Sequence, residues 1–173
     1  LPGDDIVERE RRDRLPYRKW AEDGWLTLTS GNVLDYNAVR LEVLKFAERY
    51  DVQEVAYDRW GATALVSQLM EDGLTQVVPT GQGFATLSAP SKELERLVLG
   101  GMLRHNGSPV LQAHVDAVTL SSDPAGNIKP DKKRSASRID GVVALVMAIH
   151  AASLNNGSQS TRSVYEERGL EAV

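Results

Sequence analysis

Residues 138–152 read RIDGVVALVMAIHAA and form the most apolar stretch of the chain. Apolar side chains occupy nearly every helical face of this run, which predicts a helix over 138–154 that is buried on most sides. Ser135 or Ser137 is expected to cap its start. Asp140 lies in the first turn, where the helix dipole stabilises a carboxylate by about 0.3–1 kcal/mol. Taken alone, Asp140 is best explained as an acid that stabilises the helix start.

A metal ligand is the alternative interpretation of Asp140. A helix this apolar is expected to carry its acid into a partly desolvated place, where an unpaired carboxylate is costly and needs a cation. Five cations lie within ten residues, opposed only by Asp131: Lys129, Lys132, Lys133, Arg134 and Arg138. This basic loop is either a solvated loop or a local phosphate-binding edge, and its composition leaves both readings open.

The composition is that of an ordinary globular domain. The 173 residues are 42% hydrophobic and 25% charged, which predicts one domain with a real core. The chain has no cysteine, so disulfides, thiol catalysis and cysteine-based zinc sites are excluded. The net charge of −4 argues against a general nucleic-acid binder but not against a local basic surface. No run reaches the roughly 18 apolar residues of a membrane span, and the first residues lack the apolar core of a secretory signal.

Local patterns predict strands alternating with helices. The expected strands are 25–29, 53–58, 75–80 and 102–105, and the expected helices are 36–50 with Asp35 as cap, 61–73 with Gly73 at the end, 91–99, and 109–120 with Ser108 as cap. A turn-rich, hairpin-like excursion is expected over 121–137. This alternation predicts an α/β domain in which helices cover a sheet.

Asp58 is the second acid of interest, because it closes the predicted strand 53–58. Ligands collect at the carboxyl ends of strands in open α/β sheets, although aspartate also ends strands simply by favouring turns. Two carboxylates beside a basic loop suit Mg²⁺ or Mn²⁺ acting on phosphodiesters. The chain lacks a dinucleotide fingerprint, a Walker lysine, a nucleophile elbow and a zinc-type histidine pair.

Four stretches together resemble the C-terminal nuclease domain of tailed-bacteriophage large terminases. They are GNVLDYNAV (31–39), VAYDRWGATALVSQL (55–69), PTGQGFATLSAPSKELERLVLGGMLRHNGSPVL (79–111) and DPAGNIKPDKKRSASRIDGVVALVMAI (123–149). The resemblance runs from about residue 15 to about residue 154. It implies an RNase H-like α/β fold, with a mixed central sheet flanked by helices. The nuclease domain is then expected over 1–154, followed by a polar tail over 155–173.

The resemblance also implies an activity and a site. Members of the family cut concatemeric viral DNA at the start and end of packaging, using three acids that bind two divalent metals, Mg²⁺ or Mn²⁺. Asp58 and Asp140 match two of these acids. The third would lie on an opening strand upstream of Leu1, so the first strand or strands and the ATPase domain are expected to belong to a longer polypeptide. The implied partners are double-stranded viral DNA, that ATPase domain, the small terminase subunit and the portal or procapsid, in the host cytoplasm and without a membrane.

Three hypotheses follow for function. The first is a metal-dependent endonuclease with Asp58 and Asp140 as metal ligands. Its DNA-backbone contacts would come from Lys129, Lys132, Lys133, Arg134, Arg104 and His105. Such phosphate contacts give little sequence preference. The second is a module that grips DNA, or docks on the portal or motor, without cleaving. The third is an unrelated α/β protein in which Asp140 only caps its helix.

Overall fold

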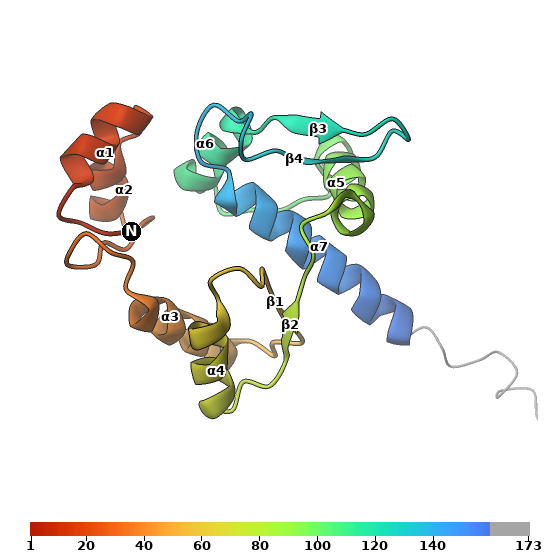
Figure 1. Cartoon of the computed structure of the whole chain (residues 1–173), viewed down its shortest axis with the longest axis horizontal. Helices are drawn as coiled ribbons and strands as arrows, with labels where there is room; N and C mark the ends of the chain where they lie inside the picture. The colour runs from red at the N-terminus through yellow and green to blue at the C-terminus, as the bar shows by residue number, and fades with distance from the viewer. Residues whose placement is uncertain (160–173) are drawn as a thin grey trace, which may run out of the picture.

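The computed structural model describes residues 1–159, in which helices flank two small sheets (Figure 1). The elements are α1 (Ile6–Asp13), α2 (Tyr17–Glu22), α3 (Tyr36–Arg49), β1 (Val55–Tyr57), α4 (Thr63–Glu71), β2 (Val77–Pro79), α5 (Phe84–Leu99), α6 (Pro109–Ala117), β3 (Leu120–Ser122), β4 (Ile128–Pro130) and α7 (Asp140–Gln159). The α/β class predicted from the alternation of patterns is confirmed. None of the helices within residues 1–159 is long and apolar enough to cross a membrane.

The predicted apolar helix is α7, and it forms the centre of the main core. Val143, Val146 and Met147 on α7 pack with Ile139, which precedes the helix, and with Leu87 of α5. In Figure 1 α7 runs between α5, α6 and the β3–β4 hairpin on one side and the β1–β2 pair on the other. Its contacts with α5, α6 and β1 explain why its sequence is apolar on several faces.

A second, smaller core joins the N-terminal helices to the rest of the chain. Ile6, Tyr17 and Trp20 are buried together, with the Tyr17 and Trp20 rings edge to face at 5.7 Å between centroids. Val110 and Ala113 of α6 pack against this cluster. The charged N-terminal segment therefore folds back on the domain with its few apolar residues inward.

The strands form two separate pairs. β1 and β2 are parallel, with Val55 opposite Val77, and β3 and β4 are antiparallel, with Leu120 opposite Pro130. The antiparallel pair confirms the hairpin expected over 121–137. Because β1 and β2 are parallel, their carboxyl ends meet at one edge, and the Thr80 backbone N–H donates to the Tyr57 carbonyl there at 2.8 Å.

Several local predictions are confirmed. Asp35 caps α3, since its carboxylate accepts from the backbone N–H groups of Asn37 and Ala38. The Ser108 hydroxyl accepts from the Leu111 N–H at the start of α6. Gly73 follows α4 with a φ of +94°, the left-handed conformation that glycine adopts at helix ends.

Two predicted strands and the end of one helix are wrong. Residues 25–29 make only a single parallel bridge, between Thr29 and Pro2, and 102–105 form no strand. Residues 27–29 hydrogen-bond to Leu1 and Gly3, but this N-terminal neighbour is too short to form more than one bridge. The backbone N–H groups of Met102 and Leu103 instead donate to the Leu97 carbonyl at the end of α5. The helix expected to reach Leu120 ends at Ala117, since Leu120 begins β3.

Helix α5 begins at Phe84, well before the expected start at residue 91. Pro90 normally marks a helix end, yet here it lies buried inside the helix. The serines beside it are buried and hydrogen-bonded: the Ser91 hydroxyl donates to the Leu87 carbonyl within α5 at 2.6 Å, and the Ser88 hydroxyl accepts from the Ile128 N–H of β4 at 3.2 Å.

Helix α7 also differs at its ends. It begins at Asp140 rather than at 138, so Ser135 and Ser137 do not occupy the cap position. It continues to Gln159, so the first residues of the expected tail are helical. Residues 160–173 of that tail lie outside the described residues.

We expect Leu87→Ala to lower the free energy of unfolding by about 2–5 kcal/mol, because Leu87 is only 2% exposed at the contact between α5 and α7. Urea denaturation measures the change. Leu99→Ala on the same helix is the control, since Leu99 is 81% exposed and its truncation leaves no cavity. Equal losses for the two variants would contradict the placement of the core.

Candidate active site

Asp58 lies at the carboxyl edge of the parallel strand pair, directly after β1. Its side chain is half-buried, and its Oδ1 accepts from the Trp60 backbone N–H at 3.2 Å. It borders a cavity of about 410 Å³ whose other walls include Gln82, which follows β2, and Lys132. The structure thus places Asp58 where strand ends in an α/β sheet face ligands.

Asp140 is the first residue of α7 and points away from the apolar core. Its side chain is 58% exposed, whereas Val142 and Val143 in the same turn are buried, so the desolvation expected for this acid is only partial. The Lys132 ammonium lies 2.7 Å from Asp140 Oδ1. Partial burial raises the pKa of Asp140, but the hydrogen bond from Lys132 and the charges of Lys132, Arg138 and His114 outweigh it and hold this pKa below its ordinary value.

The start of α7 is capped by His114 of α6. The Gly141 backbone N–H donates to His114 Nδ1 at 3.0 Å, so the imidazole is neutral with its proton on Nε2. Burial lowers the pKa of His114, as does the charge of Arg138, against the opposing charge of Asp140. Ser135, one of the two predicted caps, instead supports the preceding turn, where its hydroxyl donates to the Asp131 carbonyl and accepts from the Thr119 N–H.

The basic loop is divided between internal and exposed positions. Lys129 is half-buried, donates to the Gln82 carbonyl at 2.9 Å and lies over the Phe84 ring at 5.4 Å. Lys133 and Arg134 are exposed, and their backbone N–H groups donate to the Asp131 carboxylate in a tight turn. Asp131 therefore shapes the loop.

Arg104 and His105 lie apart from these acids. His105 borders a different cavity, formed mainly by apolar residues of α5, α6 and α7, and Arg104 is exposed next to it in the connecting segment. Neither residue lines a cavity with Asp58 or Asp140. The structure does not gather these two residues into the candidate site.

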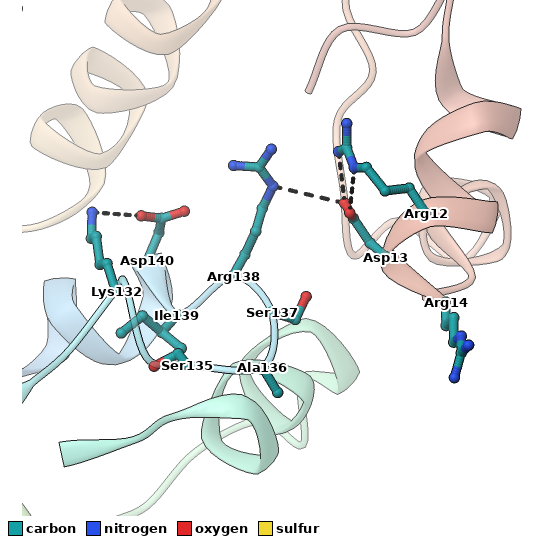
Figure 2. Close-up of a pocket in the computed structure, with 10 residues that line it drawn as sticks. All are labelled: Arg12, Asp13, Arg14, Lys132, Ser135, Ala136, Ser137, Arg138, Ile139 and Asp140. Atoms are coloured by element: carbon teal, nitrogen blue, oxygen red, sulfur yellow. Dashed lines mark hydrogen bonds and ion pairs between the residues drawn. The ribbon is translucent and has the colours of Figure 1, made fainter.

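A charged cavity that the sequence analysis missed adjoins Asp140. It measures about 620 Å³ and lies between the end of α1 and the segment before α7 (Figure 2). Figure 2 shows Arg138 reaching toward Asp13, with Arg12 on the same carboxylate. The alternating charges of 8–14 are typical of a solvated helix, so no local signal could have placed Arg12 and Arg14 beside residue 140.

Lys132 links the two candidate acids, because it lines both the Asp58 cavity and the Asp140 cavity.

Within residues 1–159, no group of three or more histidine, cysteine or acidic side chains is placed to hold a metal. The donor chemistry of Asp58 and Asp140 still fits Mg²⁺ or Mn²⁺, which need only one or two carboxylates together with water and phosphate oxygens. Asp140 already holds a cation, the Lys132 ammonium.

Comparison with known proteins identifies the family. Residues 2–156 match the family described as "Terminase large subunit, endonuclease domain". The chain belongs to this terminase endonuclease family. It is 35% identical over 153 residues to the large terminase subunit of Enterobacteria phage HK97, which covers 88% of the chain and 30% of that protein. It is also 32% identical over 167 residues to protein YmfN of Escherichia coli strain K12, covering 95% and 36%.

The fold of this terminase endonuclease domain agrees with a solved relative. The crystal structure of the HK97 large terminase superposes with a TM-score of 0.81 at 34% identity, covering 87% of the chain and 32% of that protein. This likeness is consistent with the RNase H-like arrangement expected from the sequence. The chain spans about a third of the length of the curated relatives it matches.

We expect Gly141→Ala to destabilise the protein, although alanine is intrinsically the better helix former by about 1 kcal/mol. A Cβ at residue 141 would lie 2.7 Å from His114 Nδ1 and 3.4 Å from Leu111 Cδ1. Thermal unfolding measures the change. The double variant Gly141→Ala/His114→Ala removes the clash, so it should be more stable than the sum of the two single changes. Strict additivity would show that His114 does not pack on Gly141.

We expect the free energy of unfolding to fall as the pH drops below about 6.5, the ordinary pKa of histidine. The folded pKa of His114 is lowered, so below this pH the unfolded chain binds more protons than the folded one. This contribution is complete above the unfolded pKa and is lost as the pH falls through the folded value. Urea denaturation from about pH 8 to about pH 5 should show a weaker dependence for His114→Gln, because glutamine accepts from Gly141 without titrating. An identical dependence in the variant would assign the effect to other groups.

Proposed function

We propose that the chain is a metal-dependent endonuclease domain that cuts concatemeric phage DNA at the initiation and termination of packaging. One observation carries this proposal: in a chain of the terminase endonuclease family, Asp58 and Asp140 border neighbouring cavities that share Lys132. The acids come from a strand end and a helix start that are distant in sequence. Two acids that are distant in sequence but border cavities with a shared lysine are better explained by one functional site than by separate roles in a turn and at a helix start.

Asp58 and Asp140 are the residues that would hold the divalent metal. Such an ion supplies an activated water and stabilises the leaving oxygen of the cut strand. The Lys132–Asp140 pair is exposed on both sides, at 59% and 58%, so its separation costs no more than about 1 kcal/mol. Lys132 can therefore leave Asp140 free for a metal and turn its ammonium toward a DNA phosphate.

The first turn of α7 orients Asp140 for this role. His114 holds the Gly141 N–H, and Ile139 on the other side of Asp140 is 1% exposed in the core. The carboxylate is thus flanked by two fixed residues. A preorganised acid loses little conformational entropy when it takes up a ligand.

The larger assembly that we propose is supported by the family and by the length of the relatives. The proposed partners are double-stranded viral DNA, an ATPase domain of the same polypeptide, the small terminase subunit and the portal or procapsid. The proposed location is the host cytoplasm. Lys132, Lys133 and Arg134 are the residues of the basic loop proposed to contact the DNA backbone, since they are exposed.

Asp58→Asn and Asp140→Asn should each reduce cleavage of supercoiled plasmid in Mn²⁺ by on the order of a hundredfold or more, because each removes a charge that holds the metal. Gel analysis of nicked and linear products measures the rate, and calorimetric titration with Mn²⁺ measures metal binding separately. Asp116→Asn is the matched control, an exposed acid on α6 that should retain full activity.

Loss of cleavage with unchanged Mn²⁺ binding would contradict the assignment of Asp58 and Asp140 as ligands. Cleavage that survives both substitutions would contradict the proposed site. If the unaltered chain binds duplex DNA but never cuts it, the alternative holds: a DNA-gripping or docking module that does not cleave. The absence of a three-acid group within residues 1–159 is the observation that favours this alternative.

A further inference from the structure

The charged cavity beside Asp140 has two walls that come from opposite ends of the chain. One wall is the end of α1, with Arg12, Asp13 and Arg14. The other is the segment leading into α7, with Lys132, Arg138 and Asp140. Four cationic side chains and two carboxylates thus line the cavity of about 620 Å³, which gives it an excess of two positive charges. This excess occurs in a chain whose net charge is −4.

Asp13 joins the two walls. Its carboxylate accepts from Arg12 at 2.7 and 3.1 Å and from the Tyr17 hydroxyl at 2.9 Å, and Arg138 Nε lies 3.9 Å away. The Asp13 side chain is only 12% exposed, whereas Arg12 and Arg138 are 59% and 48% exposed. The hydrogen bond from Arg12 is the main reason that the pKa of Asp13 lies below its ordinary value, so the acid stays charged. It therefore holds two exposed guanidinium groups together.

Arg14 adds a cation without an acid. It follows α1 in the left-handed conformation, with a φ of 54°, and its side chain is exposed. Within the part of the chain that the structure describes, no carboxylate lies within ion-pair distance of its guanidinium. Its positive charge is therefore uncompensated at the rim of the cavity.

We propose that this cavity binds the phosphate backbone of double-stranded DNA and leads one strand to Asp140, with Arg12, Arg14 and Arg138 as the phosphate contacts. The inference rests on the proposed endonuclease function and extends its DNA contacts to α1. Arginine suits this role because its planar group donates two parallel hydrogen bonds to phosphate oxygens. Lys132 ties the cavity to the candidate acid, since it lines the cavity and pairs with Asp140.

Asp13 is a positioning residue in this arrangement. If only net positive charge mattered, Asp13→Asn would tighten DNA binding, because it removes a negative charge from the cavity. If Asp13 aims Arg12 and Arg138 at the same strand, the variant should bind more weakly. The two explanations therefore predict opposite signs.

The experiment measures binding of the full chain to a fluorescein-labelled duplex of about 30 base pairs by fluorescence anisotropy, in EDTA and at salt from about 50 to about 200 mM. The test variant is Arg12→Gln/Arg14→Gln/Arg138→Gln. The matched control, Lys45→Gln/Arg49→Gln/Arg96→Gln, removes the same charge from α3 and α5. Arg96 is 59% exposed and paired with Glu93, as Arg12 is with Asp13.

Each lost phosphate contact should reduce the slope of log K against log salt by about 0.9, and the affinity near 0.1 M salt by roughly fivefold to tenfold. The control should bind within about twofold of the unaltered chain. Asp13→Asn should weaken binding, with circular dichroism confirming that it is folded. An Asp13→Asn variant that is folded and binds more tightly would overturn the positioning role.

The outcomes separate this inference from the proposed function. Plasmid cleavage by the unaltered chain, together with an unchanged salt slope in the test variant, overturns the cavity assignment and leaves the endonuclease standing. A reduced slope in a chain that never cleaves supports the cavity and overturns the endonuclease. Three other results would overturn the cavity assignment. They are equal losses of affinity in the test and control variants, efficient competition by polyglutamate at equal charge, and no binding of DNA at all.

Discussion

Burial of α7 is the constraint on which the rest of the structure depends. A helix with apolar residues on several faces must be covered on several faces, and α5, α6 and β1 provide this cover. Full burial of one such side chain contributes about 1.5–3 kcal/mol, so Val143, Val146 and Met147 together outweigh any single polar contact of the domain. The position of α7 is thereby fixed, and with it the direction in which its first turn points.

The candidate site forms where that burial ends. Ile139 is inside the core and Asp140, the next residue, is largely exposed, so the chain passes from apolar packing to solvent within one peptide. His114 accepts a hydrogen bond from the Gly141 N–H at the start of the helix, which an apolar neighbour could not do. A rigid helix therefore presents a carboxylate at its solvent-facing end, and the Lys132 that pairs with it also lines the cavity at Asp58.

Sequence patterns correctly predicted structural features that depend on residues close together in the chain. They missed features that depend on contacts between residues distant in the chain. Asp35 and Ser108 cap helices through N–H groups two or three residues away, so their roles were readable. The cap of α7 was not readable, because His114 lies 27 residues from Gly141. Asp58 and Asp140 could be proposed as candidates because they lie at the end of a predicted strand and the start of a predicted helix. That Lys132 lines the cavities of both acids could be seen only in the folded structure. The strand expected at 25–29 failed because alternation of polarity cannot reveal how long the neighbouring segment is: residues 1–3 pair with 27–29 over a single bridge.

The two acids of the charged cavity differ in how firmly they hold their cations. Lys132 and Asp140 are both more than half exposed, and a single pair of this kind contributes at most about 1 kcal/mol. Asp13 is nearly enclosed and binds Arg12 through two hydrogen bonds, a geometry that is considerably stronger. If both pairs were as weak as Lys132–Asp140, all the cations that line the cavity would be free to change position. Arg12 is therefore held more firmly than Lys132. In the proposed site this difference would let Asp140 release Lys132 to take a metal while Asp13 keeps Arg12 in place.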